Sequence, residues 1–298
     1  MNLARVRSAL TRLVRLRDPE VPERVGPPER PVTVEVPEQV GSPERPATVE
    51  EMLPPPGDDS VGVGDFRAIG EAFVEELKRS CGLQPRHRVL DVGCGIGRIA
   101  IPLTQYLSKE GSYEGFDPVR RSIEHCRARI APSYPNFRFE LADLYNKQYN
   151  PEGLVHDHEY RFPYPDASFD VAFAVSVFTH LLPPGAERYI AETARVLKPG
   201  GRFLATFFLL NDASIEGIDG GKSTLTLPYR REGHRVEVEK FPEAAVGYDE
   251  ALVMELYRAH GLALTQPTGY GVWSGRTPSG YGGYQDLVVT GPRERQPA

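Results

Sequence analysis

The feature that most constrains the fold of this chain is a glycine-rich stretch directly after a short apolar run. It reads Val89-Leu-Asp-Val-Gly-Cys-Gly-Ile-Gly97. An apolar run of this length, bounded by glycines and followed by a helical pattern, predicts a buried strand that turns sharply into a helix. Glycine allows such a turn and lets a ligand approach the backbone closely. Because N–H groups at a helix start can hold an anion, we expect a ligand here.

The rest of the chain favours an α/β fold. From about Val61, apolar runs alternate with helical patterns, which is typical of β-α-β units. We predict one Rossmann-like, doubly wound domain over residues 61–298, with a mostly parallel seven-stranded sheet. Its expected strands are 88–92, one ending at 115–117, 137–141, 169–175, 202–209, 262–266 and 285–290. Its expected helices are 66–81, 99–107, 118–130, 186–197, closed by Lys198-Pro-Gly-Gly201, and one from Asp249 to Gly261. A hairpin is expected over residues 225–238, outside the main sheet.

The first 60 residues form a different region, rich in Pro, Glu, Arg and Val. Val21 to Glu35 recurs almost unchanged as Val36 to Glu50, a tandem repeat of 15 residues. The repeat is too short and too rich in proline to build a solenoid. We therefore predict a disordered tail over residues 1–60, acting as an extended spacer.

Ahead of the repeat, residues 1–17 combine apolar residues at helical spacing with several arginines. This pattern predicts a short basic amphipathic helix. Two interpretations stay open. The helix could make weak contact with a membrane surface or a partner, since one short helix without a lipid anchor binds membranes only marginally. Alternatively, it is a frayed terminal helix with solvated arginines.

The composition excludes several classes of protein. A net charge of −6 gives no broad positive field, so we expect no nucleic-acid partner. The three cysteines have no paired spacing, which argues against a disulfide framework and against a zinc site. The sequence has no apolar run of the roughly 18–20 residues that span a bilayer, and no signal-peptide core. We therefore expect a cytoplasmic protein, and the sequence predicts no oligomeric state.

The spacing of the glycines separates two kinds of nucleotide ligand. A dinucleotide-binding loop needs its third glycine three positions after the second, where this chain has Arg98. Here the glycines alternate instead, at positions 93, 95 and 97. Asp117 follows Gly97 by twenty residues, at the end of the next expected strand, where it can accept both hydroxyls of a ribose. The alternative is that Asp117, before Pro118, only caps a helix.

Four segments of this sequence, taken in order, resemble the class I S-adenosylmethionine (SAM)-dependent methyltransferases. They are VLDVGCGIGR, GFDP, Phe162-Pro-Tyr-Pro-Asp-Ala-Ser-Phe-Asp170 and Arg195-Val-Leu-Lys-Pro-Gly-Gly201. The likeness covers about Gln84 to Phe207 and is closest to small-molecule, bacterial-type members. It implies SAM as the cofactor.

The resemblance also implies roles for single residues on the cofactor side. Residues expected at the methionine part of SAM are Asp91, Gly93, Cys94, Gly95 and Gly97. Those expected at or near the ribose and adenine are Asp117, Pro118, Asp143 and Leu144. Ser176, after the fourth strand, is also expected near the cofactor. The adenine contact of Asp143 has an alternative, a carboxylate that caps a loop. The chain departs from the family pattern by an insertion, residues 144–161, before the Phe162 segment.

His180 is the candidate catalytic residue. Methyl transfer from a sulfonium uses an activated donor, so alignment in a dry pocket can supply most of the catalysis. A hydroxyl acceptor would still benefit from a general base. His180 follows the fourth strand at the edge where α/β sheets bind ligands. The alternative is that His180 only bonds backbone or lines the cofactor pocket.

Four residues are candidate contacts for the acceptor. Tyr149 and His156 lie in the insertion, while Trp273 and Arg276 lie on a glycine-rich connection before the last strand. Aromatic rings suit a sugar or a planar acceptor, although a solvated loop or packing against the sheet is the alternative. Neighbouring residues such as His156 to Glu159 rarely converge on one ion, so we predict no metal site.

These residues predict a SAM-dependent methyltransferase that acts on a small molecule, with a hydroxyl of a sugar or natural product as the expected acceptor. Two alternatives stay open. The first is a noncatalytic SAM-binding scaffold that docks through its N-terminal tail. The second is an oxidoreductase, which the glycine spacing disfavours.

Overall fold

The computed structural model describes residues 45–55, 64–146, 150–280 and 282–293. The predictions for the basic helix and the first repeat copy, and for Tyr149, lie outside the described residues. Among the described helices, none is long and apolar enough to cross a membrane.

The centre of the molecule is a seven-stranded sheet in the order β10-β11-β5-β4-β1-β2-β3. All pairings are parallel except those of β11, which runs antiparallel to both its neighbours. The predicted fold class is thereby confirmed. The strands are β1 (Arg88–Val92), β2 (Ser112–Asp117), β3 (Phe137–Leu141), β4 (Phe169–Ala174), β5 (Leu197–Phe207), β10 (Leu262–Leu264) and β11 (Asp286–Pro292).

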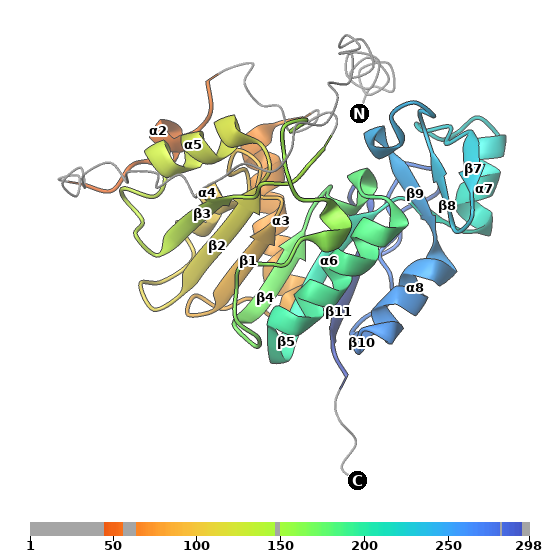
Figure 1. Cartoon of the computed structure of the whole chain (residues 1–298). Helices are drawn as coiled ribbons and strands as arrows, with labels where there is room; N and C mark the ends of the chain where they lie inside the picture. Colours follow the sequence, from red (N-terminus) through yellow and green to blue (C-terminus); the bar gives the residue numbers. More distant parts are fainter. Residues whose placement is uncertain (1–44, 56–63, 147–149, 281, 294–298) are drawn as a thin grey trace.

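Helices cover both faces of this sheet, with α6 in front of β4 and β5 and α3 behind (Figure 1). Successive strand residues therefore face two different cores. In β4, Ala172 belongs to the core that includes α6, and Val171 belongs to the core that includes α3. This burial on both faces explains why the strands are nearly continuous in apolar residues. The helices are α3 (Phe66–Cys81), α4 (Ala100–Leu103), α5 (Arg120–Arg129), α6 (Pro183–Val196) and α8 (Glu250–Ala259).

Several predicted boundaries were wrong. Helix α5 begins at Arg120 and not at Pro118, because Val119 has an extended backbone and its N–H donates to Asp117 Oδ1 at 2.9 Å. Helix α4 is confined to Ala100–Leu103, and turns follow it. Helix α6 begins three residues early, at Pro183, since proline is well tolerated in a first helical turn.

The segment Lys198-Pro-Gly-Gly201 follows the helix, as the sequence predicted, but the strand begins before it and not at residue 202. It lies within β5, as an irregularity where the pairing of β4 and β5 shifts register after Phe169. Lys198 Nζ bonds both carboxylate oxygens of Asp170 at 2.8 Å, which ties this irregular segment to β4.

A second, smaller sheet stands beside the first, in the order β6-β9-β8-β7 (Figure 1). The predicted hairpin is confirmed as the antiparallel pair β7 and β8, although its strands are shorter than expected. We call residues 208–249 the small-sheet region. Its elements are β6 (Leu209–Leu210), α7 (Asp212–Asp219), β7 (Tyr229–Arg231), β8 (His234–Val236) and β9 (Val246–Asp249).

The folded domain begins earlier than the sequence predicted. Residues 45–55, assigned to the tail, pack against the domain through the short helix α2 (Val49–Met52). The side chain of Met52 has no exposed surface. A single buried methionine in a segment rich in Pro and Glu is too weak a pattern to reveal this contact from sequence.

Candidate cofactor and acceptor site

The glycine loop forms the turn between β1 and α4. Gly93, Gly95 and Gly97 have φ angles of +78°, +52° and +88°, a region that side chains rarely adopt. A Cβ at Gly93 would also lie 2.4 Å from Cγ2 of Val177, so glycine is required there for space as well. The predicted strand-to-helix turn is therefore present, and glycine is required in it both for its φ angles and for packing against Val177.

Asp117 ends β2 beside this loop. Its Oδ2 accepts the N–H of Gly95 at 2.9 Å, and its Oδ1 accepts the N–H of Val119. Burial raises the pKa of this carboxyl to about 6. Two sequence motifs separated by twenty residues thus meet in one place. Pro118 follows directly, half-buried. The bond to Val119 holds the turn before α5 and does not cap the helix, whose first residue is Arg120. The ribose contact of Asp117 stays a prediction.

Asp91 lies beneath the loop, with only 2% of its surface exposed. It accepts a hydrogen bond from Tyr113 Oη at 2.6 Å, and burial raises its pKa to about 8. Gly115 makes room for this pair, because a Cβ there would lie 2.8 Å from Tyr113 Oη. The sequence analysis missed Tyr113, whose only signal was a tyrosine inside a buried strand.

Two buried thiols support the loop from below. Cys94 and Cys126 each place Sγ 3.7 Å from the carbonyl oxygen of Gly95. Burial raises the pKa of both thiols, so they stay protonated. All three cysteines, including Cys81, are free, which confirms that the chain has no disulfide framework.

Asp143 follows β3 at the same edge of the sheet. The residue is exposed, and its Oδ1 accepts the N–H of Leu154 at 3.3 Å. The next residue, Leu144, is buried and pairs with Val155, so the insertion folds back on its own start. This arrangement fits a loop-capping carboxylate and also leaves Asp143 accessible to an adenine. Its adenine contact stays a prediction.

Ser176 follows β4 with a φ of +60°, which is uncommon for a residue other than glycine. Two long-range bonds hold it. Its N–H donates to Thr206 Oγ1 at 2.8 Å, and its hydroxyl donates to Gln285 Oε1 at 3.1 Å. Strained residues of this kind gather at functional sites. Sequence reasoning found Ser176 but missed its two partners, which lie 30 and 109 residues away.

His180 ends the short 3-10 helix η2 (Phe178–His180) and reaches the small-sheet region. Its Nδ1 lies 2.8 Å from the carbonyl oxygen of Glu243, in η3 (Pro242–Ala244). Because a carbonyl can only accept, Nδ1 carries the proton of the neutral ring and Nε2 carries the lone pair. Burial lowers the pKa of His180, so the ring is neutral near pH 7. This is the tautomer and charge that a general base needs.

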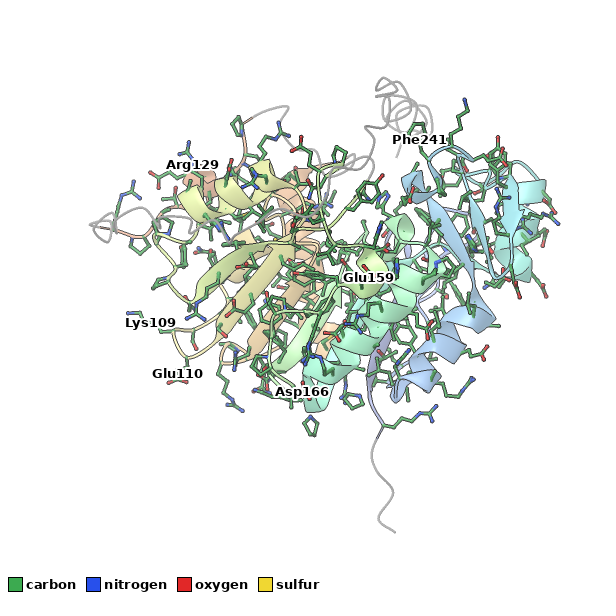
Figure 2. All side chains as sticks on the ribbon, in the orientation of Figure 1. Lys109, Glu110, Arg129, Glu159, Asp166 and Phe241 are labelled. Atoms are coloured by element: carbon green, nitrogen blue, oxygen red, sulfur yellow. The ribbon has the colours of Figure 1, made fainter. Side chains whose placement is uncertain are left out.

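Figure 2 shows where the small-sheet region lies relative to the two ends of the main sheet. Lys109 and Glu110, which precede β2, lie at its lower edge, whereas Phe241, directly before η3, lies at the upper edge of the molecule. The small-sheet region therefore reaches the carboxyl ends of the parallel strands, where open α/β sheets bind their ligands.

His156 lies in an exposed stack of rings on the insertion. Its ring centroid is 5.5 Å from those of Tyr145 and His158. The neighbouring 3-10 helix η1 (Asp157–Glu159) packs on α6, where Figure 2 shows Glu159. Within the described parts of the chain, no group of three or more His, Cys, Asp or Glu residues could hold a metal ion. The acceptor contact of His156 stays a prediction.

Trp273 and Arg276 are not placed where an acceptor contact would need them. Trp273 is completely buried, and its Nε1 donates to Asp286 Oδ2 at 2.8 Å. Arg276 bonds both oxygens of Asp286 at 2.7 Å and also Asn211 Oδ1 at 3.0 Å. This placement corrects the expectation for both residues. They pack the small-sheet region against β11, because Asp286 gathers their N–H groups in the interior.

Comparison with known proteins agrees with this site. A family described as "Methyltransferase domain" matches residues 89–201. The methyltransferase GfsG of Streptomyces halstedii is 31% identical over 147 residues, 48% of this chain and 46% of that protein. The 27-O-demethylrifamycin SV methyltransferase of Amycolatopsis mediterranei is 32% identical over 147 residues, 48% of this chain and 47% of that protein. The chain thus spans less than half the length of these relatives.

A solved structure extends the comparison of the fold. The PH0226 protein from Pyrococcus horikoshii OT3 superposes with a TM-score of 0.53 at 19% identity, covering 78% of this chain and 93% of that chain. At this identity the likeness concerns the fold alone. Residues 89–201 thus match a methyltransferase domain, and the relatives that match this part of the chain are methyltransferases, which agrees with the order of the motifs and with SAM as the expected cofactor.

Proposed function

We propose that this protein is a cytoplasmic enzyme that transfers a methyl group from SAM to a small molecule, at a hydroxyl of a sugar or natural product. One observation carries the proposal. The Asp117 carboxylate and the N–H of Gly95 meet at 2.9 Å, so a ribose acceptor and the glycine turn share one site. The relatives support a small-molecule acceptor, since one of them is named for rifamycin SV methylation.

The donor side fits SAM by the chemistry of its groups. Asp117 offers a carboxylate to the two ribose hydroxyls, and Asp143 offers one to the adenine amino group. The turn of residues 93–97, whose three glycines have positive φ angles, would receive the amino acid part. SAM itself supplies an electrophilic methyl group on a positively charged sulfur.

The acceptor side needs a base and a means of orienting it. His180 would take the proton of the acceptor hydroxyl at Nε2. The Nδ1–H bond to the Glu243 carbonyl holds the ring in place and strengthens when the ring becomes positive. Ser176 fixes the start of the segment that carries His180, through Thr206 and Gln285. Alignment of the acceptor with the methyl group would supply the rest of the rate.

Two measurements test the proposal. Calorimetry with SAM, S-adenosylhomocysteine and NADH should show binding of the first two and none of NADH. Transfer of tritiated methyl from SAM to a small-molecule extract should then be detected, with His180→Gln as the matched variant that keeps SAM binding. Binding of NADH would point to an oxidoreductase. SAM binding without transfer to any acceptor would favour the noncatalytic scaffold.

A further inference from the structure

The start of the folded domain is attached to one helix of the cofactor side. We call residues 45–53 the clasp. Three hydrogen bonds join it to α5 and the turn that follows α5. They are Ala47 N–H to Ser133 Oγ at 2.8 Å, Tyr134 Oη to Ala47 O at 3.2 Å, and His125 Nε2 to Met52 O at 3.0 Å.

The clasp also has a buried anchor. The Met52 side chain is completely buried and belongs to the same apolar core as Ile123 and Cys126 of α5 and Ala100 of α4. Burial of this apolar side chain adds to the three hydrogen bonds in favouring the docked clasp.

Helix α5 also contacts the glycine loop. Cys126 Sγ lies 3.7 Å from the Gly95 carbonyl oxygen. A Cβ at Gly97 would lie 2.9 Å from Ile130 Cδ1 and 3.1 Å from Cys126 Sγ. Helix α5 also begins three residues after Asp117. One short helix thus stands between the clasp and both donor-side motifs.

The clasp depends on two residues of its own sequence. Thr48 and Glu51 form a capping box at the start of α2, and Arg45 bonds both oxygens of Glu51. A four-residue helix does not form without such caps and a buried contact, because helix nucleation is unfavourable. Glu51 supplies the cap, and Met52 supplies the buried contact.

The tandem repeat shows that only its second copy can form the clasp. Aligned over 15 positions, the first copy has the counterparts of Arg45 and Thr48. The two residues that follow the first copy are Val36 and Pro37, whereas the two that follow the second copy are Glu51 and Met52. The first copy therefore lacks the capping carboxylate and the buried side chain.

We propose that the clasp is a positioning element for SAM binding. Docked on α5, it holds the glycine loop and Asp117 in the arrangement that receives the cofactor. Releasing the clasp weakens SAM binding and leaves the rate at saturating SAM nearly unchanged. The inference rests on the proposed function. Since coupling between two sites is reciprocal, SAM must stabilise the docked clasp by the same factor that the clasp improves SAM affinity.

The first experiment makes the second copy resemble the first, in the full-length protein. Glu51→Val with Met52→Pro should raise the Kd for SAM about fivefold or more, the lower range of typical coupling. The kcat at saturating SAM should stay within about twofold. The matched control, Val36→Ala with Pro37→Ala, changes the equivalent positions of the first copy and should leave the Kd within about twofold.

The second experiment needs no variant and therefore decides the question if the first variant does not fold. The amides of Met52 and Leu53 donate to the carbonyls of Thr48 and Val49, so their hydrogen exchange reports opening of the clasp. Saturating SAM should slow this exchange about fivefold or more. If the wild type binds SAM but neither the exchange rate nor the Kd of the variant changes, the clasp proposal is overturned and the proposed function stands. If wild type binds no SAM, both fail.

Discussion

The proposed donor side and the proposed acceptor side of this molecule are built differently. The donor side takes its groups from residues 91–143, at the adjoining ends of β1, β2 and β3. The proposed acceptor side joins His180 to Glu243 across 63 residues. Neighbouring parallel strands thus assemble a cofactor site from local motifs. The acceptor site depends on long-range packing of the small-sheet region.

The largest expected effect is on that packing. Asp286 accepts the N–H groups of Leu209, Gly271 and Trp273 and pairs with Arg276, all in the interior. Asp286→Asn should lower the free energy of unfolding by about 3 kcal/mol, because Arg276 keeps its buried charge without a carboxylate partner. Urea unfolding measures this value.

The control for this variant is an ion pair at the surface of the same region. Glu239→Gln removes the exposed pair with Arg231 and should change stability by less than about 0.5 kcal/mol. A similar loss in both variants would show that the interior pair does not anchor the small-sheet region.

On the donor side, Asp117→Asn should weaken SAM binding about 10- to 100-fold, since hydrogen bonds to a charged group contribute about 1.5–3 kcal/mol. The folded state should persist, because the amide oxygen can still accept the N–H of Gly95. Calorimetry measures the Kd, and circular dichroism checks the fold. A Kd within about twofold of wild type would remove Asp117 from the ribose site.

On the acceptor side, His180→Gln should slow methyl transfer at least about tenfold, the lower end of general-base contributions. The Kd for SAM should stay within about twofold. Glutamine can still donate a hydrogen bond toward Glu243 O but cannot take a proton. Steady-state kinetics and calorimetry on the same samples give both numbers, and unchanged turnover would exclude His180 as the base.

SAM binding on the donor side should depend on pH through Asp117. Because the pKa of Asp117 lies near 6, SAM affinity should fall as the pH drops through 6 and the carboxylate becomes protonated. Stability of the ligand-free protein should respond to this group in the opposite direction. A pKa raised above the usual value near 4 means that the folded state binds the proton more tightly, so this group adds stability as the pH falls from about 6 to 4.

Calorimetry between pH 5 and 8 measures the affinity, and urea unfolding without SAM measures the stability. In Asp117→Asn the change in affinity around pH 6 should disappear. If that variant keeps the wild-type pH profile, another group governs it.

The smallest expected effect is that of Asp143→Asn. Its exposed carboxylate competes with water, so the Kd for SAM should rise only about two- to threefold. A loss as large as that of Asp117→Asn would mean that the adenine side is as buried as the ribose side when SAM is bound.

Sequence reasoning predicted the glycine turn and its meeting with Asp117, because both motifs follow neighbouring strands of the predicted sheet. It reached much less of the acceptor side. Helix α7 and the strands β6 and β9 are too short for periodicity to reveal. The partner of His180 is a backbone carbonyl, which leaves no signal in the sequence. Trp273 was misassigned because an aromatic residue in a glycine-rich connection has the same pattern whether it binds a ligand or fills a core.

The bond between His180 and the Glu243 carbonyl has a consequence for protein engineering. Since the orienting group belongs to the main chain, position 243 tolerates exchange of its side chain, and the base keeps its tautomer. A foreign segment could replace residues 208–249 as a route to new acceptors only if it places a carbonyl oxygen within hydrogen-bond distance of His180 Nδ1. The proposed base, His180, is thus oriented by the small-sheet region.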